Sequence, residues 1–327
     1  MHQSALMSAA RALASLKLTL AALVLLGAGI VYAYIGEERG NLTLVLPLAL
    51  LSLNLIAAVA THPAFRKWNA LLVFHLALIA LVLLVTIGRL TYLRGTVELA
   101  TGEEFAGHLL ETDAGIWHPW KSLEKVRFVN HGFTIGYAPE LLRDRTRNKV
   151  SYLNDDGSEH AMEIGDQTPL VLAGYRFYTT PNKGFAPTFL WRPAGGEPML
   201  GTVHLPSYPI HEYRQAREWQ LPGTGIQVWT MLQFDEIILD PKAPSEFRLP
   251  KEHKVIVRIG AKRYELQPGQ AIDLPEGRLV YDGLRSWMGY SVFYDWTIHW
   301  LLAASAVLIG ALGWHFWRKF SAKPWNP

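Results

Sequence analysis

The feature that most constrains this chain is a set of four long apolar blocks. They cover roughly residues 17–36, 42–61, 69–89 and 292–315. A helix needs about 20 mostly apolar residues to cross the hydrocarbon core of a bilayer. The pattern therefore predicts a membrane protein with four transmembrane α-helices, three in the N-terminal region and one near the C-terminus.

The long segment between the third and fourth blocks has the composition of a globular domain. Several runs in it alternate apolar and polar residues or are rich in β-branched and aromatic residues, which is typical of strands; examples are Val97–Leu99, Phe133–Tyr137, Arg176–Tyr178 and Val255–Ile259. Turn signals separate such runs, at Asp155–Gly157, Pro181–Gly184, Ala194–Gly196 and Pro275–Gly277. We expect a large β-rich domain, built as a β-sandwich or an open barrel, with short helices at 103–110, 139–146 and 210–219.

The distribution of charge predicts the orientation in the membrane. Lys and Arg without Asp or Glu fill three short segments, 1–17, 61–68 and 316–327, whereas the first loop between blocks carries Glu37, Glu38 and Arg39. Short loops rich in Lys and Arg stay on the cytoplasmic side. The net charge of +3 thus reports topology, and no nucleic acid is expected as a partner.

These signals predict an order of segments along the chain. It runs as a cytoplasmic N-terminus (1–16), three transmembrane helices (17–90), an extracytoplasmic β-rich domain (91–290), a fourth transmembrane helix (291–316) and a cytoplasmic tail (317–327). There is no cysteine, which excludes a thiol redox site, an Fe–S cluster and covalent haem attachment to this chain.

Two histidines inside apolar blocks are the main candidates for chemistry. His75 lies in the third block and His299 in the fourth. An ionisable residue in hydrocarbon is costly and is a functional hypothesis by default, and neutral imidazole is a common ligand of haem iron. Asp295 lies one helical turn before His299, so its carboxylate is placed to orient that ring.

The expected depths leave the number of sites open. His75 lies roughly 9 Å from the cytoplasmic edge and His299 roughly 10 Å from the opposite edge, at 1.5 Å per residue. Their heights then differ by on the order of 10 Å in a core of about 30 Å. One haem between two tilted helices and two separate sites are both compatible, as are two structural histidines that bind no metal.

Other polar residues have structural interpretations. Asn54 in the second block is expected to bond another helix, with a ligand pocket as the alternative, and Gly27 and Gly29 indicate close helix packing. His315 fits a residue at the membrane interface. The outside histidines form no recognised metal motif, and His204 and His211 are the nearest to a pair; all are expected to be structural or on the surface.

The chain resembles the ResB (CcsB) family of cytochrome c biogenesis proteins. The architecture of three spans, a large outside domain and a closing span is similar to that family's. Local sequence is also similar: Leu13–Leu18 to its LASLKL entry, Phe74–Leu76 to its FHLG segment, Arg94–Leu99 with Gly102 and Glu103 to its GTVxLxEGE exit, and Ala173–Tyr178 to its GYRFYQ strand.

The resemblance implies a function in system II cytochrome c maturation. Such a protein lies in the inner (cytoplasmic) membrane and works with a ResC (CcsA)-type membrane protein to move haem to apocytochrome c. His75 then takes the family's third-span histidine role, and His299 is the fourth-span candidate, both holding haem b without a covalent bond. Whether the chain alone is an enzyme stays open. The alternatives are a b-type haem electron carrier and a non-catalytic assembly or scaffold protein.

Overall fold

The computed structural model describes residues 2–35, 42–154 and 156–321. The first loop with Glu37, Glu38 and Arg39, the turn residue Asp155 and the end of the tail lie outside the described residues. The chain divides into two compact units. One holds the chain up to Arg94, the segment Asp113–Pro119 and the chain from Tyr294, and the other holds Gly95–Thr112 and Trp120–Phe293.

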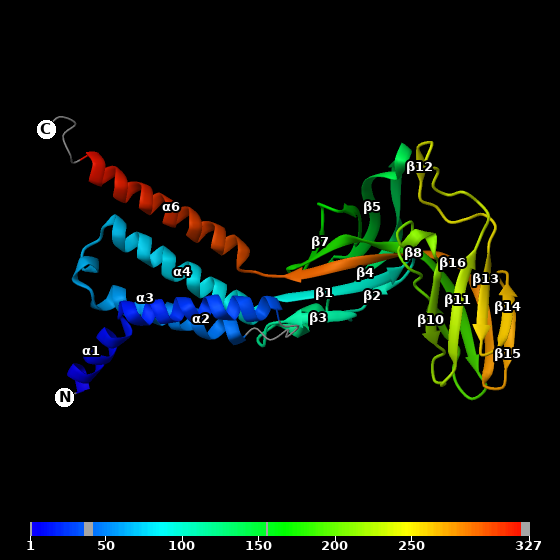
Figure 1. Ribbon diagram of the computed structural model, residues 1–327, viewed down its shortest axis with the longest axis horizontal. Helices are drawn as coiled ribbons and strands as arrows, with labels where there is room; N and C mark the ends of the chain where they lie inside the picture. The colour runs from blue at the N-terminus through cyan, green and yellow to red at the C-terminus, as the bar shows by residue number, and fades with distance from the viewer. Residues whose placement is uncertain (1, 36–41, 155, 322–327) are drawn as a thin grey trace. The chain divides into compact units, whose positions relative to one another are not determined.

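The first unit is helical. Its helices are α1 (His2–Leu13), α2 (Leu16–Ile35), α3 (Leu42–Thr61), α4 (Ala70–Thr91) and α6 (Ile298–Ser321), with a 3₁₀ turn η1 (Pro63–Phe65) before α4 (Figure 1). The helices α2, α3, α4 and α6 are long and apolar enough to cross a membrane. Helix α1 was not predicted, because apolar length was the signal for helices and its 12 residues are too short to cross a bilayer.

The structure corrects the start of the last helix. Residues 291–294, expected inside the fourth span, are the end of strand β16, and α6 begins at Ile298. The strand end is as aromatic and apolar as the helix that follows, so hydropathy alone does not separate them. This shift moves Asp295 out of the helix and places His299 in its first turn.

Asn54 joins three helices of this unit. Its amide nitrogen donates to Leu13 O at 2.6 Å and Ser15 O at 3.2 Å, and its oxygen accepts from Thr19 Oγ1 at 2.7 Å. Leu13 is the last residue of α1, where helix carbonyls lack partners in their own helix, whereas Ser15 O also accepts from Leu18 N and Thr19 N at the start of α2. The helix-bonding interpretation of Asn54 is therefore confirmed.

The second unit is built from strands, as expected. The strands are β1 (Leu93–Ala100), β2 (Glu104–Phe105), β3 (Glu111–Ala114), β4 (Phe128–Ala138), β5 (Leu142–Leu153), β6 (Glu159–Gly165), β7 (Leu170–Leu172), β8 (Tyr175–Pro193), β9 (Met199–Thr202), β10 (Ala216–Gln220), β11 (Gln227–Gln233), β12 (Ser245–Glu246), β13 (Lys254–Ile259), β14 (Lys262–Leu266), β15 (Ala271–Leu274) and β16 (Gly277–Tyr294). β1 and β3 each have residues in both units.

The prediction of three short helices in this domain is wrong. Residues 103–110 contain β2, residues 139–146 contain the 3₁₀ turn η2 (Pro139–Leu141) and the start of β5, and residues 210–219 contain the 3₁₀ turn η3 (His211–Tyr213) and β10. Sheet pairing decides the outcome, since Leu142 pairs with Ala138 and Thr146 with Ile135. The short helix α5 (Trp120–Leu123) was not expected.

The strands form three sheets. A seven-stranded sheet has the order β3-β1-β16-β8-β7, with β15 on β16 and β9 on β8. A five-stranded sheet has the order β12-β4-β5-β6 with β2 on β4, and a four-stranded sheet has the order β10-β11-β13-β14. The antiparallel registers are well defined, for example Thr230 of β11 opposite Val257 of β13.

The long strands β8 and β16 contribute side chains to two cores. In one core, Phe177 of β8 and Tyr290 of β16 contact Phe128 of the five-stranded sheet at ring distances of 5.0 and 5.7 Å. In the other core, Phe189 of β8 contacts Trp219 of β10 at 5.6 Å and Tyr281 of β16 at 5.5 Å. The domain is thus a pair of sandwiches that share one sheet, and each fully buried aromatic ring contributes roughly 2–3 kcal/mol.

The middle of β8 differs from the sequence prediction. Pro181–Gly184, expected as a turn, lies inside the strand. Gly289 of β16 packs against it so closely that a Cβ there would lie 2.8 Å from Thr180 Oγ1. Its Pro, Asn and Gly residues are typical of a turn, but pairing within the seven-stranded sheet holds the segment extended.

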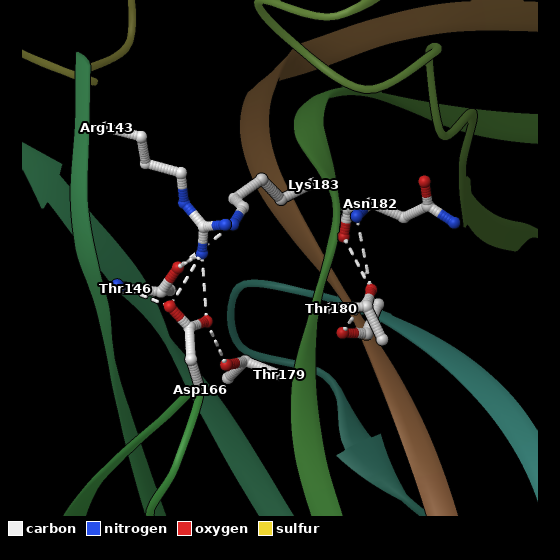
Figure 2. A network of polar contacts seen from close by, with 8 residues as sticks. Arg143, Thr146, Asp166, Thr179, Thr180, Asn182 and Lys183 are labelled. Carbon is white, nitrogen blue, oxygen red and sulfur yellow. Dashed lines mark hydrogen bonds and ion pairs between the residues drawn. The ribbon is translucent and has the colours of Figure 1, made fainter. Parts of the chain in front are cut away.

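A polar network lies beside this segment (Figure 2). Lys183 is 2% exposed, and its Nζ donates to Thr146 Oγ1 at 3.0 Å. Arg143 forms an ion pair with Asp166 at 2.8 Å and also donates to Thr146. Thr179 donates to the same Asp166 carboxylate at 3.1 Å. The network therefore joins β5 and β8 through two cations and one carboxylate.

Candidate functional site

His75 has a fixed tautomer. It is the sixth residue of α4, half-buried, and its Nδ1 lies 2.8 Å from Leu71 O. A carbonyl oxygen only accepts hydrogen bonds, so Nδ1 carries the proton and donates. In the neutral ring Nε2 then holds a lone pair, and no hydrogen bond to Nε2 is found among the described residues. This is the form of histidine that ligates a metal, with a backbone carbonyl fixing the other nitrogen.

Aromatic rings flank His75. Phe65 lies 4.7 Å from it and Phe74 5.4 Å, measured between ring centroids. Phe65 belongs to the turn η1, and Asn69 ties that turn to α4 by donating to Ala64 O and accepting from Leu72 N. The ring of His75 thus lies at the N-terminal end of α4 in apolar surroundings that suit a flat hydrophobic ligand.

Asp295 does not lie one helical turn before His299. Its Oδ1 accepts from Thr297 N at 2.9 Å and from Thr297 Oγ1 at 2.7 Å. This local turn precedes α6, in which His299 is the second residue and is exposed. The structure therefore gives Asp295 a role in starting the helix and shows no bond from it to His299.

The structure separates His75 from His299. A Cβ added at Gly88 of α4 would lie 2.9 Å from Thr297 Oγ1, and Trp296 Nε1 donates to Thr91 Oγ1 at 3.1 Å. The start of α6 therefore lies beside the C-terminal end of α4. The 13 helical steps from residue 75 to residue 88 span about 20 Å. One iron cannot take both imidazoles from the same chain, so a single haem held by both histidines does not fit this geometry, whereas two separate sites and two structural histidines both fit it.

A small polar cavity lies at the C-terminal end of α4. Its volume is about 290 Å³, and its lining includes the charged residues Arg89, Arg94, Asp113 and Asp295. Tyr92 OH donates to Asp113 at 2.7 Å, and the Arg89 guanidinium lies 5.7 Å from the Tyr92 ring centre. Both signs of charge are present there, which is typical of a water-facing helix end.

The segment Asp113–Pro119 caps that end of α4. Gly115 N donates to Tyr92 O at 3.0 Å, Trp117 N to Leu90 O at 2.8 Å and His118 Nδ1 to Thr91 O at 2.9 Å. Three carbonyls that have no partner in their own helix are thereby satisfied. Gly115 is required because a Cβ there would overlap Leu90 O. We refer to residues 113–119 as the α4 cap.

His118 is a structural residue of the α4 cap. It is 5% exposed and makes an edge contact with the Tyr294 ring at 5.1 Å. Burial lowers the pKa of His118, although the hydrogen bond to Thr91 opposes this change. The structural interpretation of this outside histidine is confirmed, while the cap itself could not be found from sequence because it depends on contacts between distant residues.

Three more outside histidines also have protein partners. His204 bonds Glu98 at 2.8 Å, His131 bonds Ser151 at 2.7 Å and His253 bonds Tyr281 at 2.8 Å. Within residues 2–35, 42–154 and 156–321, no group of three or more His, Asp or Glu side chains is arranged to hold a metal ion.

The comparisons with known proteins agree with the motifs. The sequence model of the ResB-like family matches residues 56–207. This stretch includes α4 with His75, the exit into β1 and the strands through β9, and it ends before His299 and α6. No curated protein matches the chain. The match over residues 56–207 confirms the resemblance to the ResB-like family found in the sequence.

Proposed function

We propose that this protein binds haem in the membrane through His75 and hands it to a partner complex that attaches it to apocytochrome c. The match to the ResB-like family implies involvement in cytochrome c biogenesis. The observation that carries the haem proposal is the His75–Leu71 hydrogen bond, which leaves Nε2 as a ligand in apolar surroundings. When bound, haem supplies the vinyl groups that react with client thiols, and the protein supplies position.

A second axial ligand comes from another chain. His299 of the same chain lies about 20 Å of helix away from His75, as the contacts of Gly88 and Trp296 indicate. A low-spin haem on His75 therefore needs a ligand from a partner, and a ResC-type membrane protein is the partner we propose. His299 and its haem form a separate, exposed site in this proposal, at the other end of the helices.

The proposed location is the inner membrane with both termini in the cytoplasm. Arg66 and Lys67 lie between α3 and α4, and Arg318 and Lys319 lie in the last turn of α6. The positive-inside tendency then places the β-rich domain on the outer side. Single cysteines in this cysteine-free chain test the topology: a membrane-impermeant maleimide should label Leu200→Cys in intact spheroplasts and should label Arg66→Cys only after lysis. The reverse pattern would refute the orientation.

The haem proposal is tested by the visible spectrum of the purified protein. Wild type, His75→Ala, His299→Ala and the control His315→Ala are purified with and without a ResC-type partner under ample haem. The low-spin Soret band should be lost in His75→Ala, restored by added imidazole, and kept in His315→Ala. Haem content should fall only partly in His299→Ala, because that site is separate.

The alternatives give different results. Stable, redox-active low-spin haem in the chain without any partner, with no effect on cytochrome c maturation when His75 is replaced, would indicate an electron carrier. A colourless wild type in both preparations, with cytochrome c maturation unchanged in His75→Ala, would refute haem binding and leave a scaffold protein.

A further inference from the structure

A large cavity lies in the β-rich domain, separate from both histidine sites. Its volume is about 780 Å³. It is lined by residues of β1, β8, β10 and β16 and by the end of β9, all within the second unit. A volume of this size is within the range of sites that bind small or extended ligands.

One wall is the free edge of a strand. Arg217, Glu218 and Trp219 of β10 all line the cavity. Successive side chains of a strand point to opposite faces, so a cavity that touches three in a row lies along the edge of the strand. β10 is the outermost strand of its sheet and has β11 as its one neighbour.

The pairing shows which main-chain groups lie at this edge. Leu232 N donates to Gln215 O and Leu221 N to Ile226 O, so the odd-numbered residues of β10 bond β11. The even-numbered residue Glu218 therefore turns its N–H and C=O away from β11, toward the free edge. A free edge of this kind can take up a further strand.

The facing wall is held in place by bonded side chains. His204 Nδ1 donates to Glu98 at 2.8 Å, and its ring stacks on Trp287 at 5.0 Å with an angle of 3° between the planes. Trp287 Nε1 in turn donates to Leu205 O at 2.9 Å. Arg217 reaches from β10 to His204 O at 2.9 Å. The two walls are thus preorganised around the cavity.

The charges at the cavity favour a cationic ligand. Glu98, Glu111 and Glu218 line it, against one arginine, Arg217, whose guanidinium is already bonded to His204 O. Glu111 and Glu218 are exposed and have no ion pair among the described residues. Leu110 adds an apolar side chain, 65% exposed, to the lining.

We propose that this cavity docks an extended, cationic segment of a polypeptide, which adds to the free edge of β10 as a strand. The proposal deepens the proposed function and rests on it, because the client there is an unfolded polypeptide. Main-chain bonds to the edge supply affinity without a fixed sequence, and the carboxylates select for Lys or Arg.

The test uses the full chain in lipid nanodiscs and a short fluorescein-labelled peptide of alternating threonine and lysine. A photo-crosslinking amino acid at Leu110 should capture this peptide, whereas one at the exposed control position Val171 should not. The double variant Glu111→Lys with Glu218→Lys should weaken binding about tenfold or more. The matched control, Glu159→Lys with Glu197→Lys, changes two exposed glutamates outside the cavity by the same charge and should bind as wild type does.

Hydrogen exchange decides the mode of binding. Bound peptide should slow exchange of the Glu218 and Gln220 amides and leave the Trp219 amide, already bonded to β11, unchanged. Equal loss of binding in both double variants, or no slowing at Glu218, would overturn the proposal. Haem spectra of the same variants keep the two proposals apart: an unchanged Soret band with lost peptide capture concerns docking alone, and a missing band with retained capture concerns haem alone.

Discussion

The side-chain amide of Asn54 in α3 donates a 2.6 Å hydrogen bond to the main-chain carbonyl of Leu13, the last residue of α1. Together with the bond to Ser15 O and the bond from Thr19 Oγ1, it gives hydrogen-bond partners to polar groups at the break between α1 and α2. The break coincides with Leu13–Leu18, one of the motifs that pointed to the family. Helix packing therefore explains the motif: it ends one helix and starts the next at a place where the Asn54 amide can bond the main-chain carbonyls.

Asn54→Leu should destabilise the helical unit. The substitution leaves the carbonyl of Leu13 without its partner, and polar bonds between membrane helices contribute about 0.6–2 kcal/mol. Thermal unfolding in detergent should show a lower midpoint. Ser52→Ala is the matched control, because Ser52 is equally buried and bonds only Leu48 O of its own helix. Equal midpoints for the two variants would contradict the proposed role of Asn54.

Gly115→Ala should detach the α4 cap. A methyl group there would overlap Leu90 O, so the loop must move and the bonds from Gly115 and Trp117 must lengthen or break. Overpacking of this kind costs about 1–3 kcal/mol. Amide exchange at Trp117 should accelerate. Gly225→Ala is the control, since nothing lies within 4 Å of its Cβ position; unchanged exchange in Gly115→Ala would mean that the cap is looser than the distances indicate.

The α4 cap should loosen in acid. Burial lowers the pKa of His118 below its ordinary value of 6.5. The folded state then binds fewer protons than the unfolded state, so stability rises with pH up to about 6.5 and is lost as pH falls through the lowered pKa. Exchange of the Trp117 amide, corrected for intrinsic rate, should increase between pH 7 and pH 5 in wild type. The increase should be absent in His118→Gln, and its persistence there would assign it to another group.

Lys183 should make the β-rich domain more stable at alkaline pH. Burial lowers the pKa of Lys183 to about 8, with Arg143 acting in the same direction and Asp166 against it (Figure 2). Between about pH 8 and 10.5 the unfolded state holds more protons, so stability rises with pH in this window, by roughly 3 kcal/mol in total. Thermal midpoints measured across the window should show this rise.

Lys183→Met is the variant that isolates the charge. The thioether side chain is apolar and of similar length, and Thr146 Oγ1 still accepts from Arg143 at 2.6 Å. The variant should be at least as stable as wild type at pH 7 and should lose the alkaline rise. A variant that is much less stable at pH 7 would show that the Lys183–Thr146 bond outweighs the cost of burying the ammonium.

Much of the helical unit could be predicted because a bilayer leaves few choices. Helices that satisfy their own backbone groups are required in hydrocarbon, so apolar length alone located α2, α3 and α4. The same signal failed at the start of α6, where the apolar end of β16 continues into the helix. The misplaced start also produced the wrong relation between Asp295 and His299.

The candidate site could be predicted only where it depends on residues close together in the sequence. The Leu71–His75 bond follows from helical spacing, and His75 stood out as an ionisable residue in an apolar run. The contact with Phe65 and the cap formed by residues 113–119 depend on how separate segments pack. The cavity beside β10 likewise depends on which strand ends its sheet, which alternation of residues does not encode.

The shared sheet has a consequence for how the outer domain comes apart. Phe177 and Phe189 belong to one strand, as do Tyr281 and Tyr290, yet each pair serves two different cores. Neither sandwich can melt without unpairing strands that the other requires. The β-rich domain therefore unfolds as a single cooperative unit, so that a destabilising substitution in one sandwich also lowers the stability of the other.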